Sequence, residues 1–154
     1  MERRYTFFQH NHSSVLIESE LDRIDTFEEF EKRFSDEMLN EDAQIRNCIG
    51  KLLIKHNIGA ATLSKKAGLS IGYVGLLQNG KKTNPSRDIL LKICIACNAT
   101  IDETQELLKV AGCQPLYVRR KRDVIIWFGL KKGYNIADID DELYAHNLKT
   151  LNKE

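Results

Sequence analysis

The chain of 154 residues can bury one hydrophobic core with a small appendage; 42% of its residues are hydrophobic and 29% are charged. Its longest uncharged apolar run, Val124 to Leu130, is too short to cross a bilayer, and without a recognisable secretory signal we expect a cytoplasmic protein. The net charge of +1 is unevenly distributed, with −7 in residues 1–42, +11 in 43–132 and −3 in 133–154. A basic centre suits a polyanionic partner, although ordinary solvated helix faces would give the same pattern.

The pattern of apolar residues predicts an all-α fold, because strand-like alternation is absent and only two prolines interrupt the chain. Within an acidic N-terminal extension, residues 1–42, Thr26 can cap a helix that we place at about 26–39. The apolar stripe of this helix consists of phenylalanines at three-to-four spacing: Phe27, Phe30 and Phe34. We therefore predict one amphipathic helix in the extension, and the first dozen residues show no clear period.

Residues 43–114 are predicted to form a five-helix domain. Apolar residues at helical spacing mark its five segments: Ile45 to His56, Leu63 to Ala67, Val74 to Leu77, Ile89 to Ala96 and Leu107 to Ala111. The last of these helices is expected to stop at Gly112, with Pro115 beyond it.

The second and third segments have the pattern of a helix-turn-helix. Gly68 lies where the two helices meet at a steep angle, which requires a positive φ that glycine adopts at low cost. Ser70 is predicted to cap the second helix, and Asn79-Gly80 to end it. A second helix presented in this way can enter the major groove of DNA.

The run LSKKAGLSIGYVGLLQNG at residues 63–80 resembles the helix-turn-helix of the Cro/repressor (Xre-type) family of bacterial and phage regulators. The match extends through the loop KKTNPS at 81–86. This resemblance implies a Cro/repressor-like domain in a transcriptional regulator that binds double-stranded operator DNA. It also implies a two-fold homodimer whose half-sites are about one helical turn apart.

The resemblance places the candidate DNA-binding residues around the second helix, starting at Ser70. The base-facing positions near its start are Ile71, Gly72, Tyr73, Gly75 and Leu76. None of them offers the bidentate amide or guanidinium group on which direct base readout relies. The flanking positions that would grip the sugar-phosphate backbone are Lys65, Lys66, Asn79, Lys81, Lys82, Asn84 and Arg87.

Two functions are compatible with this imbalance between apolar and basic positions. The first is a regulator that binds DNA with either sequence-specific or weakly specific recognition. The alternative is a protein-interaction module, antitoxin-like or an adaptor, which keeps the scaffold and has lost base readout. This second interpretation would give the chain a protein partner.

Residues 115–154 are predicted to form a C-terminal helical hairpin that repeats the preceding pair of helices. The segment starting Arg87-Asp88 recurs 35 residues later as Arg122-Asp123. Glu106-Leu107-Leu108 recurs 36 residues later as Glu142-Leu143-Tyr144. The difference between the two offsets implies one inserted residue. The hairpin begins with a basic run, Arg119 to Arg122. This run could extend the DNA footprint to a neighbouring phosphate, form a solvated helix start, or pair with acidic residues such as those of the 26–42 helix.

The four cysteines are expected to stay reduced and to bind no metal. Cys94 and Cys97 have the spacing of a metal or redox motif, but they lie inside a predicted helix and no second pair of ligands has a matching spacing. Cysteine also serves as a small buried hydrophobic residue in helical cores. No phosphate-binding glycine loop, His-Glu metal motif or nucleophile elbow occurs, so we predict neither an enzyme nor a cofactor.

Overall fold

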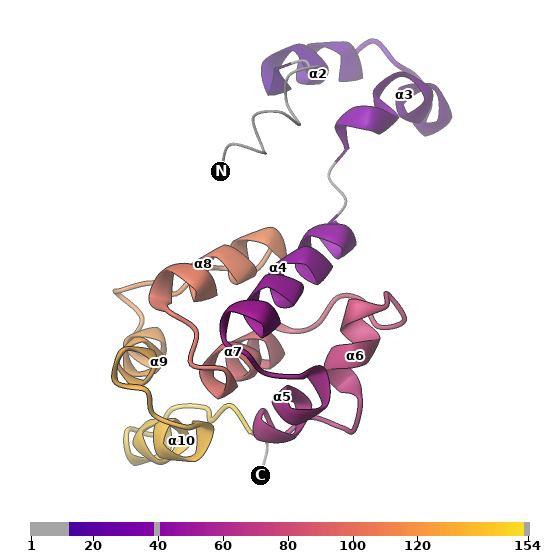
Figure 1. The fold of residues 1–154 in the computed structure, drawn as a ribbon. Coiled ribbons are helices and arrows are strands. Elements are labelled where there is room, and N and C mark those ends of the chain that lie inside the picture. Colours follow the sequence, from indigo (N-terminus) through magenta and orange to yellow (C-terminus); the bar gives the residue numbers. More distant parts are fainter. Residues whose placement is uncertain (1–12, 39–40, 153–154) are drawn as a thin grey trace. The chain divides into compact units, whose positions relative to one another are not determined.

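The computed structural model describes residues 13–38 and 41–152. These residues form helices joined by turns and loops, without a strand among them, which confirms the predicted all-α fold class. The chain divides into two compact units, residues 1–40 and 41–154 (Figure 1). The expectation about the first dozen residues concerns a segment outside the described ones.

The first unit contains the helices α2 (Ser14–Leu21) and α3 (Phe27–Phe34) and the short 3-10 helix η1 (Ser35–Glu37). The hydroxyl of Thr26 accepts a hydrogen bond from the Glu29 N–H at 3.2 Å, so the predicted cap is present. The predicted amphipathic helix is present but shorter than expected, and a helix without an apolar stripe precedes it. The α-helix ends at Phe34, where the chain tightens into η1, and α2 precedes it. Periodicity missed α2 because its residues form no apolar stripe and none of them is buried.

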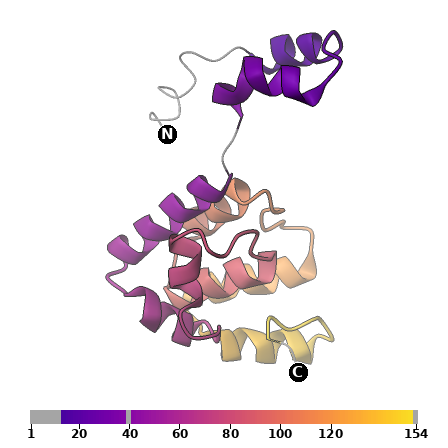
Figure 2. The ribbon, with the colours of Figure 1, turned by 90° about the vertical axis from the view of Figure 1, so that its right-hand side faces the viewer.

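The second unit contains the helices of the predicted five-helix domain and of the hairpin. They are α4 (Glu41–Lys55), α5 (Ala60–Lys66), α6 (Tyr73–Gln78), α7 (Arg87–Ala96), α8 (Ile101–Val110), α9 (Lys121–Lys132) and α10 (Ile136–Ala145). Helix α4 packs against α8, and α5 packs against α6 and α7 (Figure 1). Helix α10 lies at one edge of the unit, in contact with α7 and α9 (Figure 2).

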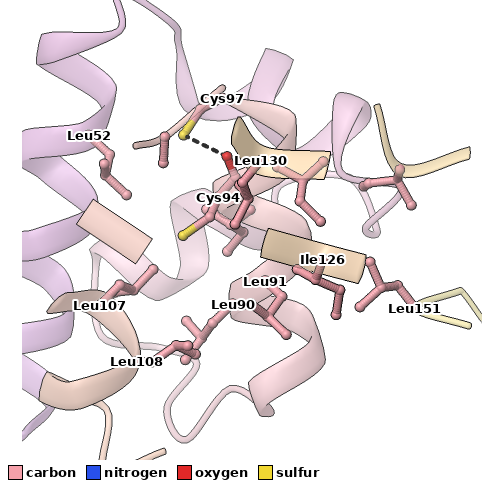
Figure 3. Packing of buried hydrophobic residues seen from close by; sticks show 14 of the residues in the cluster. Leu52, Leu90, Leu91, Cys94, Cys97, Leu107, Leu108, Ile126, Leu130 and Leu151 are labelled. Atoms are coloured by element: carbon pink, nitrogen blue, oxygen red, sulfur yellow. Dashed lines mark hydrogen bonds between the residues drawn. The ribbon is translucent and has the colours of Figure 1, made fainter. Parts of the chain in front are cut away.

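One hydrophobic core joins the hairpin to the rest of this unit. Leu90 and Leu91 of α7 are fully buried, and they lie in the same cluster as Ile126 of α9 (Figure 3). Leu151, near the end of the described chain, also belongs to it. Because the hairpin shares its core with the five-helix domain, the two form one unit.

The internal repeat keeps a constant offset of 35 residues, so the predicted insertion is wrong. Thr100 and Asn135 cap α8 and α10 in the same way, each accepting a hydrogen bond from a backbone N–H three residues on. Leu108 and its counterpart Leu143 are both fully buried, whereas Tyr144, the partner suggested by the sequence, is 76% exposed. Matching short stretches of similar residues gave the wrong register for the repeat. Corresponding positions of the two copies share burial, whether or not their residues are identical.

Candidate nucleic-acid interface

The turn between α5 and α6 is fixed by two glycines and by a buried serine. Gly68 has a φ of +70°, as the sequence predicts, and Gly72, the residue before α6, has a φ of +78°. The hydroxyl of Ser64 on α5 accepts a hydrogen bond from the Val74 N–H at 2.9 Å and donates one to the Ala60 carbonyl at 3.0 Å. Ser64 thereby satisfies a free N–H of the first turn of α6.

The predicted capping role of Ser70 is therefore wrong. The residue at the N-cap of α6 is Gly72, which has no side chain to cap the helix. Ser70 lies in the preceding turn, where its carbonyl accepts a hydrogen bond from the Tyr73 N–H at 3.0 Å. Since α6 begins at Tyr73, both Ile71 and Gly72 precede the helix as well.

The outward face of α6 and its preceding turn is mainly apolar. Ile71 is fully exposed, with a relative accessibility of 101%. Tyr73, Gly75 and Leu76 are half-buried, because the opposite side of the helix carries Val74 and Leu77 into the core. The Tyr73 ring packs partly against that core, and burial raises the pKa of its phenol.

Exposed lysines lie on the two segments that adjoin α6 in the chain. Lys65 and Lys66 are exposed in the last turn of α5, while Lys81 and Lys82 are exposed in the loop after α6. The Lys82 ammonium lies 5.4 Å from the centre of the Tyr73 ring, a cation–π distance that links the loop to the helix face.

The two asparagines of the loop have different conformations. Asn79 ends α6, and its side-chain oxygen accepts a hydrogen bond from the Lys81 N–H at 2.9 Å. Asn84 has a φ of +54° and is exposed. Both amides are carried by the same loop as Lys81 and Lys82, so these polar candidates lie on the segment that directly follows α6.

Arg87 does not join these exposed groups, which corrects its assignment as a phosphate contact. Its Nε donates to the Gln114 carbonyl at 2.7 Å, and its Nη2 donates to the Pro115 carbonyl at 3.2 Å and to the Asp123 carboxylate at 2.9 Å. The guanidinium is thus committed to binding the chain that leads into α9. This role depends on residues 27 to 36 positions away and could not be read from its neighbours in the sequence.

Arg46 of α4 is a further cation beside the loop, and sequence reasoning missed it. A Cβ on Gly80 would lie only 3.3 Å from an Arg46 guanidinium nitrogen, so this side chain reaches the end of α6. Gly80 itself has a φ of +80°, a conformation that favours a residue without a side chain. No motif marks Arg46, because it lies in α4, 14 residues before the helix pair starts at Ala60.

Comparison with protein families matches residues 49–115 to the Cro/C1-type helix-turn-helix DNA-binding domain. The chain carries a Cro/C1-type helix-turn-helix domain. The match supports a DNA-binding regulator as the general class of the protein, and the matched family is not one of enzymes. The helix-turn-helix domain so defined starts within α4 and ends after α8, which leaves α9 and α10 outside it. No curated protein and no solved structure gives a significant match to the chain.

Two cysteines of the helix-turn-helix domain are buried, Cys94 in α7 and Cys97 at the end of that helix. Cys94 is fully buried, and burial strongly raises the pKa of its thiol. Burial likewise raises the pKa of Cys97 to about 11, so both thiols remain protonated at neutral pH. Among the described residues, no cluster of three or more His, Cys, Asp or Glu could hold a metal ion. No described helix is long and apolar enough to span a membrane.

An apolar groove of about 500 Å³ lies between α4 and α8, on another face of the helix-turn-helix domain. Its floor includes Leu52 and Cys48, and Ile54 at its edge is 83% exposed. Lysines of α4 line one wall, and carboxylates of α8 line the other. The groove is separate from the predicted DNA face and is a second candidate for an interaction.

Proposed function

We propose that the protein is a transcriptional regulator that binds duplex DNA through α5, α6 and the loop after α6, mainly by contacts to the phosphates. The supporting observation is the arrangement of exposed cations and amides around an α6 face with few hydrogen-bonding groups. The proposed backbone contacts are Lys65, Lys66, Asn79, Lys81, Lys82, Asn84 and Arg46. Contacts of this kind position a protein on DNA and carry little sequence information.

Weak base discrimination follows from the side chains at the centre of this surface. Ile71 and Leu76 can contact thymine methyl groups, which gives small preferences compared with bidentate hydrogen bonds. Tyr73 has a ring and a hydroxyl on the base-facing side. Replacing Tyr73 with Phe keeps the ring next to Lys82 and removes the hydroxyl, so selection from random duplexes should show a changed preference at one position.

The test of this function is the salt dependence of binding to random duplex DNA. Each phosphate contact lowers the slope of the logarithm of affinity against the logarithm of salt concentration by about 0.9. The K81A/K82A variant should therefore reduce the steepness of that slope by roughly two and weaken binding to all sequences alike. The matched control is K131A/K132A, which removes the same charge from the exposed end of α9.

The alternative function is a protein-interaction module, and the fully exposed Ile71 beside Leu76 favours it. In that case the apolar face of α6 would contact a protein rather than bases. The two functions differ in one measurement. Wild-type protein that shows no salt-sensitive binding to duplex DNA, even at low ionic strength, would rule out the regulator and leave the interaction module.

We further propose that the regulator acts as a two-fold homodimer through the groove between α4 and α8. In such a dimer, α4 of one copy faces α8 of the other. Lys51 would then lie opposite Asp102 and Glu106 of the partner, and the two Ile54 side chains would fill the grooves. Complementary walls of this kind suit the self-complementary interface that two-fold symmetry requires.

Sedimentation velocity of the free protein tests the proposed dimer. Wild-type protein should sediment with twice the chain mass of 17.7 kDa, and I54E should sediment as a monomer. Because Ile54 is 83% exposed in the single chain, the I54E monomer should keep the helical circular dichroism spectrum of the wild type. A wild-type monomer, or an I54E variant that remains dimeric, would contradict a dimer formed through this groove.

A further inference from the structure

Three consecutive basic residues, Arg119, Arg120 and Lys121, lie at the start of α9, outside the matched helix-turn-helix domain. All three are exposed, and none makes an ion pair with a described residue. The fourth member of the run differs. Arg122 is half-buried and is directed towards Asp88 of α7. The run is therefore divided into three free cations and one structural arginine.

Two crossed ion pairs fix this run beside the start of α7. Arg87 at the start of α7 binds Asp123 at 2.9 Å, and Arg122 binds both carboxylate oxygens of Asp88 at 3.0 Å each. Asp123 is 2% exposed and also accepts a hydrogen bond from the Tyr117 N–H at 2.9 Å. Bidentate arginine–carboxylate pairs are geometrically specific, so the starts of α7 and α9 are held together.

The starts of these helices border a basic cavity of about 500 Å³. Its lining residues are Arg87, Gln114, Arg120, Lys121, Arg122 and Asp123, together with Leu148. Asp123 offsets Arg87, and Asp88 offsets Arg122, whereas Arg120 and Lys121 remain without a described counterion. The uncompensated charge at the mouth of the cavity is thus positive, which suits an anionic group.

The cavity borders the helix that follows the loop with the proposed phosphate contacts Lys81 and Lys82. Arg87 follows Lys82 by five residues, and five residues span at most about 18 Å even when extended. The start of α7, where Arg87 lines the cavity, is therefore joined to these contacts by a short loop. A duplex that contacts Lys81 and Lys82 and extends past the start of α7 would present further phosphates to this cavity.

We propose that the cavity at the start of α9, with Arg120 and Lys121, is a second backbone-phosphate site for the same DNA duplex. This inference rests on the proposed function. The C-terminal hairpin then extends the DNA footprint beyond the helix-turn-helix domain, and the crossed ion pairs serve to hold the hairpin in register with α7. The ligand is the sugar-phosphate backbone, so the added contacts carry affinity without base preference.

The experiment compares the salt slopes of four proteins on one random-sequence duplex: wild type, K81A/K82A, R120A/K121A and K131A/K132A. The last variant removes the same charge as R120A/K121A from the other end of the same helix. We expect R120A/K121A to lower the steepness of the slope by about 0.9 for each phosphate that the variant no longer neutralises, with K131A/K132A at the wild-type value. Unchanged melting temperatures would establish that the exposed substitutions leave the fold intact.

The outcomes separate the two proposals. Equal slopes for R120A/K121A and K131A/K132A, with a reduced slope for K81A/K82A, would refute the second site and leave the proposed function intact. Wild-type protein without salt-dependent DNA binding would refute the proposed function and this site with it. A reduced slope for both R120A/K121A and K81A/K82A supports the site.

Discussion

Buried polar side chains in the second unit are satisfied mainly by backbone groups close to helix ends. The Thr104 hydroxyl donates to the Thr100 carbonyl at 2.9 Å, and Asp123 accepts from Arg87 and from the Tyr117 N–H. Ser64, only 1% exposed, accepts a hydrogen bond from the Val74 N–H of α6 and donates one to the Ala60 carbonyl of its own helix. Because a buried donor without a partner costs about 1–3 kcal/mol, these few contacts strongly constrain the local geometry.

The first prediction concerns the serine that holds the helix-turn-helix angle. Ser64→Ala leaves the Val74 N–H buried without its acceptor, so the free energy of unfolding should fall by about 1–2 kcal/mol. Ser70→Ala is the matched control, because Ser70 is exposed and its side chain does not cap α6. Urea unfolding of the two variants gives the comparison. Equal stabilities would mean that the Ser64 contact does not support the turn.

A second prediction follows from Glu103, which accepts hydrogen bonds from Lys55, His56 and the Thr100 N–H at 2.6, 2.9 and 2.8 Å. Burial alone would raise the pKa of this carboxyl, but these donors outweigh burial and lower its pKa to about 2. A lowered pKa stabilises the fold above the ordinary value of 4.5, and that stability is lost as pH falls from 4.5 towards 2.

The expected loss from Glu103 over this pH range is about 2 kcal/mol, reduced from the full linkage value because Lys55 is largely exposed. Unfolding free energies measured between pH 5 and 2 should be less pH-dependent in Glu103→Gln than in wild-type protein. The control Asp141→Asn removes an exposed carboxylate of α10 that makes no ion pair with a described residue, so it should retain the wild-type dependence. Identical curves for all three proteins would contradict the prediction.

At the scale of elements, the hairpin depends on a close approach of α9 to α10. Gly129 on α9 is buried, and a Cβ there would overlap the Ile139 side chain of α10. Ile139 is itself 1% exposed, so it has little room to move aside. The glycine is therefore required by interhelical packing, although a glycine inside a helix is otherwise unfavourable.

Our third prediction compares two glycines in helix interiors. Gly129→Ala should lower the free energy of unfolding by about 1–3 kcal/mol through overpacking against Ile139. Gly50→Ala on α4 should raise it by about 0.5–1 kcal/mol, because no atom lies within 4 Å of the new Cβ and alanine favours the helix. Thermal unfolding of both variants tests this difference in sign. A Gly129→Ala variant as stable as Gly50→Ala would show that α10 adjusts freely.

At the scale of the whole molecule, the division into two units has a direct consequence for truncation. The core cluster of the second unit runs from Ile45 to Leu151 and contains no residue of the first forty. Removing residues 1–40 also removes 10 acidic and 5 basic residues, which changes the net charge from +1 to +6. The second unit thus keeps its apolar core and becomes strongly basic.

The fourth prediction is that the fragment 41–154 folds by itself. It should unfold cooperatively within a few degrees of the full-length melting temperature, since its buried apolar surface is complete. Its higher positive charge should strengthen DNA binding at low salt and have less effect at high salt. Circular dichroism melts and binding titrations measure both effects. A fragment that lacks a cooperative transition would show that the core requires the first forty residues.

The sequence by itself determined the helical class, the helix-turn-helix and several helix ends. These features are local: the hydroxyl of Thr26 caps a helix whose N–H groups are three residues away, and Gly68 adopts the positive φ that its own lack of a side chain permits. The exposed lysines around α6 could also be placed, because the loop and the helix end that carry them are adjacent in the chain.

Only the tertiary structure decided which polar groups are free and which are committed. Ser64 rather than Ser70 satisfies α6, and Arg87 binds Asp123 rather than remaining exposed like Lys82. In each case the role of the side chain depends on a partner that lies ten or more residues away in the chain. Periodicity and capping rules describe neighbours within a few residues, so they cannot select between such candidates. The packing of distant helices into one core selects between these candidates, because it fixes which donors and acceptors meet.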